Sequence, residues 1–231
     1  MSFGILGDAR CRPIYEKINQ RELCDKCQAE RSPFAILDKK GKPFYSNLLP
    51  GFSSPEISIP VDVLIVAEAH GGGRHEDFRP QKELDYEISW LAAYYLTDTL
   101  RKFHQAQMRV LLQYLDTAKK SWAFTDLIKC FVWHGFDKKS NLDGEINWAT
   151  AIKYCRGYLD QQIDLLQPRK ILGLGGTVAK YFELDRPQHG SVQRINNHQS
   201  LYVHSIFPSQ WTADQWIAKK GWEKVIQGIA E

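Results

Sequence analysis

Val61-Asp-Val-Leu-Ile-Val-Ala67 is a short, continuous apolar run rich in β-branched residues. A run of this kind suits a strand that is buried on both faces of a parallel sheet. Working outward from it, similar runs predict further strands at 122–128, 170–174 and 201–207. The sequence therefore predicts four strands, each separated from the next by enough chain for a crossover connection.

Segments with helical spacing of apolar residues lie between and after these strands. They are 82–119, with a break near 101–105, then 145–166, a helix that begins at 177–182, and 213–230. Strands that alternate with helices indicate a parallel sheet covered on both faces. We expect an α/β fold: a three-layer α/β/α sandwich around a mainly parallel, four-stranded sheet. Residues 1–231 are expected to form a single domain, with 1–60 as an N-terminal extension.

The composition is that of an ordinary globular protein. Of 231 residues, 43% are hydrophobic and 25% charged, and the net charge is +3. So small a charge permits a nucleic-acid partner without indicating one. No apolar run approaches the ~20 residues that cross a bilayer, and the first residues do not read as a secretory signal. We expect no membrane association and a soluble, cytoplasmic protein.

The segments that follow the strands are the expected functional loops, because parallel sheets bind ligands at the carboxyl ends of their strands. The first strand is followed by Glu68-Ala-His-Gly-Gly-Gly-Arg-His-Glu-Asp77, in which glycines allow close backbone approach and the acids and histidines can transfer protons. The alternative is a flexible surface turn. The third strand leads into Gly173-Leu-Gly-Gly176, which lacks the full dinucleotide-binding spacing and favours close packing of the strand against the next helix.

Five cysteines are present, of which only Cys24 and Cys27 form a close C-x-x-C pair. Such a pair usually indicates metal or redox chemistry. Cys130 and Cys155 lie further along the chain, and Cys11 is left over as an expected unligated thiol.

Taken together, these segments resemble the uracil-DNA glycosylase superfamily, and most of all its iron–sulfur branch. The matching stretches are Cys24-Asp-Lys-Cys27, Ala67-Glu-Ala-His-Gly71 with Glu76-Asp77, Thr125-Asp-Leu-Ile-Lys-Cys130, Cys155, the stretch 162–175, and Phe207-Pro-Ser209. The resemblance extends over about residues 24–216. It implies a monomeric DNA-repair hydrolase that flips a uracil, or another damaged or modified base, out of DNA and hydrolyses its N-glycosidic bond.

The resemblance also implies that Cys24, Cys27, Cys130 and Cys155 ligate a 4Fe–4S cluster. Four thiolates suffice for such a cluster. The alternative, a Cys₄ zinc site, usually supplies its second pair as another C-x-x-C, whereas Cys130 and Cys155 are 25 residues apart. A further alternative is that these two are buried apolar thiols.

Several pocket positions depart from the family pattern. The Asn that reads uracil is replaced by Asp126, and the His that stabilises the departing oxygen is replaced by Phe207. His70 takes the place of a proline, and Ala67 that of a glycine. An ionised Asp offers only acceptors, so it would repel the O4 of uracil, and Phe cannot donate a hydrogen bond. These changes put uracil excision in doubt.

The candidate residues divide into two groups. The catalytic candidates are Glu68, His70, Asp77 and Asp126. The expected base contacts are Ala67, Ala69, Phe78, Asp126 and Phe207, with Phe78 as a substitute for the stacking aromatic of the family. His204 is interpreted as a core histidine. Basic residues near the strand ends, interleaved with aromatic ones, suit a DNA backbone: Arg74, Lys119, Lys120, Lys129, Lys138 and Lys139.

A rival function remains open from the sequence. This rival is a catalytically reduced, iron–sulfur nucleic-acid-binding protein on the same fold. The replacement of the family's Asn and His favours it. An iron–sulfur redox protein unrelated to DNA has no support beyond the cysteines.

Overall fold

The computed structural model describes residues 36–37, 43–44, 51–54, 57–69, 103–128, 148–195, 199–208 and 212–230. Several predicted features lie outside these residues: Cys11, Cys24, Cys27, His70, Asp77, Phe78 and Cys130, the side chain of Ala69, and the expected helical segment before residue 103.

The main sheet has the strand order β3-β5-β4-β6-β8-β7. Its strands are β3 (Phe52–Ser53), β4 (Val63–Ala69), β5 (Trp122–Ile128), β6 (Lys170–Leu174), β7 (Val192–Arg194) and β8 (Leu201–Ser205). The central four, β5, β4, β6 and β8, run parallel, whereas β3 and β7 pair antiparallel at the edges. The predicted four-stranded sheet is thus the centre of a six-stranded one. The edge strands were missed because two or three residues are too few to show a periodic pattern.

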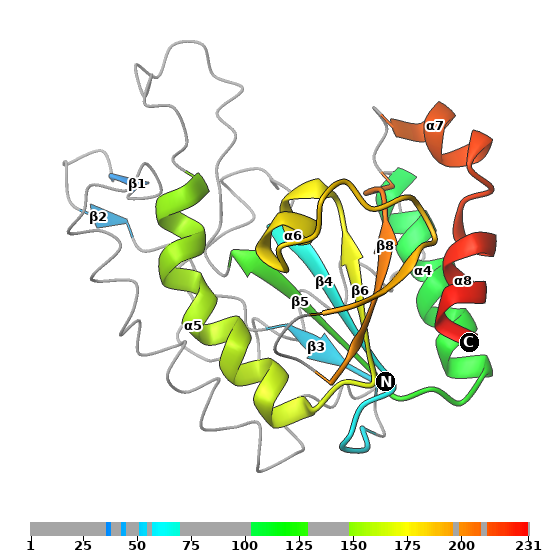
Figure 1. The fold of residues 1–231 in the computed structure, drawn as a ribbon, viewed down its shortest axis with the longest axis horizontal. Helices are drawn as coiled ribbons and strands as arrows, with labels where there is room; N and C mark the ends of the chain where they lie inside the picture. Colours follow the sequence, from blue (N-terminus) through cyan, green and yellow to red (C-terminus); the bar gives the residue numbers. More distant parts are fainter. Residues whose placement is uncertain are drawn as a thin grey trace.

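Helices cover both faces of the sheet (Figure 1). They are α4 (Phe103–Thr117), α5 (Trp148–Leu166), α6 (Gly176–Tyr181), α7 (Ala213–Ala218) and α8 (Trp222–Ala230). One layer holds α5 and α6, which are joined by a hydrogen bond from the Tyr181 hydroxyl to Asp160. The other holds α4 and α8, where Trp222 Nε1 donates to the Gln107 carbonyl at 2.7 Å. The predicted three-layer α/β/α architecture is therefore confirmed. A separate two-stranded sheet pairs β1 (Ile36–Leu37) with β2 (Pro43–Phe44).

The single helix expected over 213–230 is wrong, because the chain turns between α7 and α8. Lys220 and Gly221 have φ values of 62° and 47°, which end a right-handed helix. A Cβ on Gly221 would lie 2.8 Å from Nε1 of Trp216, so the missing side chain lets the turn close over that indole. The sequence reads as one helix because apolar residues recur on both sides of the turn, where Trp216, Trp222 and Val225 are all buried.

Candidate active site

The carboxyl ends of the four parallel strands meet at one edge of the sheet. The register pairs Ala67 of β4 with Asp126 of β5, and Leu174 of β6 with Ser205 of β8. The chain segments predicted to carry function therefore all start from this edge. Four expected site residues lie there within the described part of the chain: Ala67, Glu68, Asp126 and Phe207.

Asp126 is a buried carboxylate, with 1% of its surface exposed. The preceding residue, Thr125, donates from its hydroxyl to Oε1 of Gln162 on α5 at 3.1 Å. Because side chains alternate along a strand, Asp126 faces the opposite layer, which holds α4. Trp122, on the same side of β5, confirms this, since its Nε1 donates to Asp116 of α4 at 2.7 Å. A carboxylate this deep must be matched by hydrogen-bond donors from the chain or from a ligand.

Glu68 and Ala67 project to different sides of the sheet. The register sets Val66 beside Thr125 and Ala67 beside Asp126. Ala67 therefore shares a face with Asp126, whereas the half-buried Glu68 turns toward the α5 and α6 layer. Asp126, and not Glu68, therefore lies on the same face of the sheet as Ala67, which is expected to contact a base.

Phe207 is fixed at the neighbouring strand ends. The N–H of Gly175, just after β6, donates to the Ser205 carbonyl at 2.7 Å. Gly175 has a φ of 98°, and a Cβ built on it would lie 3.9 Å from Cβ of Phe207. The Phe207 carbonyl accepts a hydrogen bond from Oγ1 of Thr212 at 2.6 Å. Phe207 is half-buried and packs against the core.

The family model for the uracil DNA glycosylase superfamily matches residues 32–225. The chain belongs to this superfamily. The match covers the whole main sheet, including the carboxyl ends of its four parallel strands. No curated protein matches the chain. Membership of this superfamily suggests a DNA glycosylase-like function.

His204 is a core residue of this superfamily member, as its place in the fourth strand predicted. It is 4% exposed, and its Nδ1 lies 3.3 Å from the Tyr202 hydroxyl. Burial, helped by the nearby His189 and Lys219, lowers the pKa of His204 to about 4. His204 is therefore neutral at pH 7.

Gly173 makes room for Tyr202 rather than for a nucleotide. A Cβ on Gly173 would collide with the hydroxyl and ring of Tyr202 on the adjacent strand. The prediction of close packing was right, but the partner is this ring and not the next helix. Phe182, at the end of α6, packs on the same ring with centroids 5.4 Å apart.

His189 is a buried ring next to this edge that sequence reasoning missed. It lies in the loop between α6 and β7 and is 7% exposed. Its Nε2 lies 2.8 Å from the Gly221 carbonyl, and the Ile206 N–H donates to Nδ1 at 3.3 Å. Burial lowers its pKa. No local pattern could have revealed it, because both partners are distant in the sequence.

One of the expected ligand cysteines lies within the described residues. Cys155 is 5% exposed and stands seven residues, about two helical turns, before Gln162 on α5. The end of α5 lies at the amino end of β4, since Val61 N–H donates to the Leu166 carbonyl at 3.0 Å. Cys155 is therefore displaced toward the carboxyl edge. Among the described residues, no cluster of three or more His, Cys, Asp or Glu side chains is placed to hold a metal ion. The other three expected cysteine ligands lie outside the described residues.

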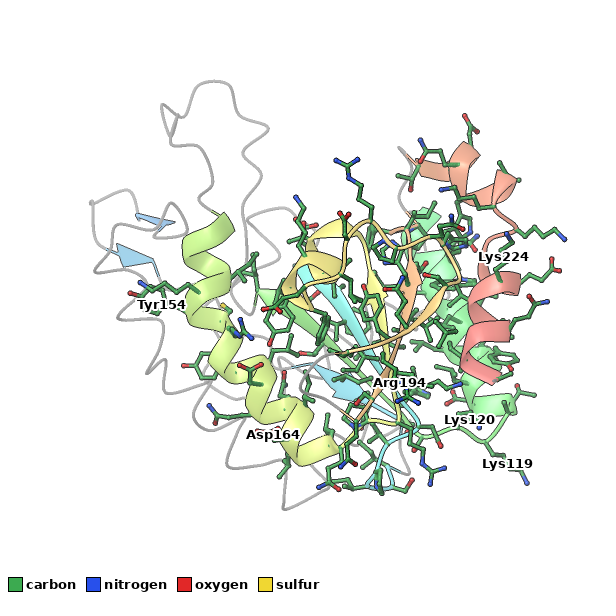
Figure 2. The ribbon with its side chains drawn as sticks, viewed as in Figure 1. Lys119, Lys120, Tyr154, Asp164, Arg194 and Lys224 are labelled. Carbon is green, nitrogen blue, oxygen red and sulfur yellow. The ribbon has the colours of Figure 1, made fainter. Side chains whose placement is uncertain are left out.

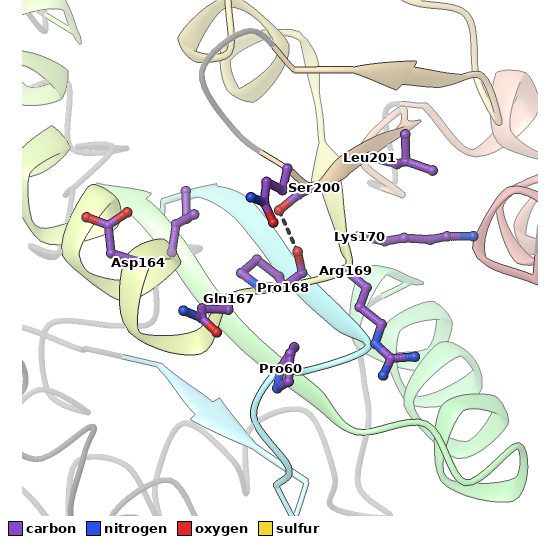
Figure 3. Close-up of a pocket in the computed structure, with 10 residues that line it drawn as sticks. Pro60, Asp164, Gln167, Pro168, Arg169, Lys170, Ser200 and Leu201 are labelled. Atoms are coloured by element: carbon purple, nitrogen blue, oxygen red, sulfur yellow. Dashed lines mark hydrogen bonds between the residues drawn. The ribbon is translucent and has the colours of Figure 1, made fainter.

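A groove of about 610 Å³ opens at the opposite, amino-terminal edge, between the end of α5 and the starts of β6 and β8 (Figure 3). Three of its polar side chains make structural contacts. Ser200 donates to the Pro168 carbonyl, and Arg169 pairs with Asp62 at 3.8 Å. Lys170 Nζ donates to the last carbonyls of α8 at 3.0 and 2.9 Å. The groove is thus separate from the candidate site.

Two of the basic residues expected to meet DNA lie on the wrong side for that role. Lys119 and Lys120 follow α4 and precede β5, so they stand at the amino-terminal edge (Figure 2). The reason is that they come before a strand rather than after it. Arg74, Lys129, Lys138 and Lys139 lie outside the described residues. No helix in the described part of the chain is long and apolar enough to cross a membrane.

Proposed function

We propose that this protein is a DNA N-glycosylase that receives a flipped base at the carboxyl edge of its sheet and hydrolyses the bond between base and sugar. Membership of the superfamily over residues 32–225 is the observation that carries the proposal. The burial of Asp126 beside Ala67 at that edge supports it. We expect the protein to act as a cytoplasmic monomer on DNA.

The proposed chemistry needs a water molecule directed at the sugar and a base that can leave. The transition state carries positive charge on the sugar, so a nearby carboxylate both stabilises it and can accept a proton from water. Asp126 is our first candidate for contact with the base, and Glu68 and Asp77 are candidates for activating the water. His70 is a candidate for stabilising the departing oxygen of the base, in place of the histidine that Phe207 replaces. The backbone at Ala67 and Ala69, with the ring of Phe78, would hold the base.

The hydrogen-bonding groups of the Asp126 side chain restrict which base the site accepts. An ionised carboxylate offers only acceptors, whereas uracil presents the O4 acceptor next to its N3–H. A base that offers an N–H or an exocyclic amine at this position fits Asp126 better than uracil does. We therefore propose that the substrate is a modified or damaged base that carries donors on this edge.

We further propose that Cys24, Cys27, Cys130 and Cys155 hold a 4Fe–4S cluster, as in the iron–sulfur branch. Four thiolates are the donor set of such a cluster, and the buried place of Cys155 near the carboxyl edge is compatible with it. Cys130 follows β5 by two residues. The cluster would supply a cross-link between the N-terminal extension and the sheet. Iron and sulfide in anaerobically purified protein would support it, and stoichiometric zinc without iron would overturn it.

One assay tests the glycosylase proposal. Duplex and single-stranded oligonucleotides, each with one modified base from a panel, are incubated with the protein, and abasic sites are then cleaved with alkali. We expect the parent protein to release at least one base. Asp126→Ala should abolish this release, and the control Asp185→Asn, at an exposed site, should keep it. Release of none, by protein with its cofactor in place, refutes it.

The second candidate is a nucleic-acid-binding protein on the same fold without glycosylase activity. Phe207 favours it, because a half-buried phenyl ring cannot donate a hydrogen bond to a leaving base. This candidate predicts DNA binding that weakens as salt rises, with no abasic sites formed on any oligonucleotide.

A further inference from the structure

We propose that His189 is a positioning residue, which holds the end of β8, and with it Phe207, against the turn between α7 and α8. This deepens the proposed function, on which the base-contacting role of Phe207 rests. The contacts of His189 themselves do not depend on that function.

The ring of His189 bridges two segments through both of its nitrogens. Nε2 faces the Gly221 carbonyl at 2.8 Å, and a carbonyl can only accept, so Nε2 carries the proton. Nδ1 is then an acceptor, and it receives the Ile206 N–H at 3.3 Å. One neutral tautomer therefore satisfies both bonds at once.

The loop that carries His189 is itself attached to β8. Gly190 N–H donates to the His204 carbonyl at 2.8 Å, and His204 N–H donates to the Ser191 carbonyl at 3.0 Å. A Cβ on Gly190 would lie 2.7 Å from Cβ of Lys224, so α8 also packs closely on this loop. His189 is thus held in place by the strand whose end it supports.

Aromatic contacts connect the His189 ring to α4. His189 meets the edge of Trp216 with centroids 5.2 Å apart, and Trp216 meets Trp222 in the same manner at 4.6 Å. Trp222 in turn donates from its indole to the Gln107 carbonyl. The turn at Gly221 is therefore a rigid support, against which His189 can hold a strand end.

The strand end is held at three successive residues. Ser205 accepts from Gly175, Ile206 donates to His189, and Phe207 accepts from Thr212. Only the middle bond depends on a titratable side chain. If that bond is lost, an N–H at the half-buried Ile206 loses its partner, and the backbone must shift to find another. Phe207, the next residue, would move relative to Gly175.

Protonation removes the middle bond. Imidazolium donates from both nitrogens, so Nδ1 would then present a proton to the Ile206 N–H. The charged or titratable groups that face His189 are His204 on β8, Lys219 after α7 and Lys224, which is exposed on α8 (Figure 2). Burial and the two lysines lower the pKa of His189, so the bond persists at neutral pH and is lost in acid.

Two variants separate the two bonds. In His189→Asn the side-chain oxygen can replace Nδ1 as acceptor for Ile206, and in His189→Gln the longer amide can replace Nε2 as donor to Gly221. His189→Phe keeps an aromatic ring and loses both. Near-ultraviolet circular dichroism at pH 7 identifies which variants keep the fold.

Amide NMR spectra provide the readout. We expect Ile206 to exchange its amide hydrogen roughly 3- to 10-fold faster in His189→Gln than in His189→Asn. The amide of Gly175, a residue next to Cβ of Phe207, should shift in His189→Gln and not in His189→Asn. In the parent protein both amides should titrate together with the His189 ring.

Equal exchange of Ile206 in the parent and in His189→Gln would overturn the proposal. So would a Gly175 signal that stays in place while Ile206 changes, because Phe207 would then not follow the bond. A duplex with one U·G mismatch serves as a separate probe. If the parent binds no DNA and releases no base, the proposed function fails, while the NMR result still decides the role of His189.

Discussion

Asp126→Asn is the change that best tests how this site reads a base. The side chain is 1% exposed, and an amide has nearly the same shape as a carboxylate, so the substitution alters hydrogen bonding while leaving the packing of β5 in place. The amide supplies the donor that uracil O4 requires and keeps an acceptor for N3–H. A polar pair of this kind contributes roughly 1–3 kcal/mol, or about 10- to 100-fold in relative rate.

The assay compares single-turnover release of uracil with release of the parent's preferred base, for Asp126→Asn, the parent and the control Asp185→Asn. We expect uracil release to rise and release of the preferred base to fall in the Asp126 variant only. A fall on every substrate would mean that Asp126 activates water instead of reading the base. Unchanged rates on all substrates would refute the reasoning, because Asp126 would then lie outside the base pocket.

Three further predictions concern stability and the cofactor. His204, whose pKa is lowered to about 4, should contribute about 3 kcal/mol to the free energy of unfolding above pH 6.5, and this contribution should be lost as the pH falls toward 4. Urea unfolding at several pH values checks this. The variant His204→Gln should lose that pH dependence. Gly173→Ala should destabilise the protein by about 1–3 kcal/mol, because the new methyl group collides with Tyr202. The same change should cost less stability when it is made in the Tyr202→Leu variant. An equal loss of stability in the parent and in Tyr202→Leu would contradict the contact. Cys155→Ser should lower the iron content of purified protein well below that of Cys11→Ser, and equal iron in the two would exclude Cys155 as a ligand.

The sequence alone determined the four parallel strands at the centre of the sheet. The predicted bounds of 122–128 and 170–174 are those of β5 and β6, because a strand buried on both faces is a continuous apolar run that turn residues end sharply. The family resemblance was likewise visible in the segments that follow the strands, and the match over 32–225 confirms the superfamily. The iron–sulfur branch and the residue roles stay predictions.

What only the tertiary structure decided depends on contacts between distant residues. The turn that separates α7 from α8 forms because Gly221 closes over Trp216, whereas the apolar spacing alone continues through it. The face on which Asp126 lies follows from the bond between Thr125 and Gln162, which are 37 residues apart. His189 binds Ile206 and Gly221 at separations of 17 and 32 residues. Periodicity records only which side of its own element a residue occupies, so bonds across such separations leave no local pattern.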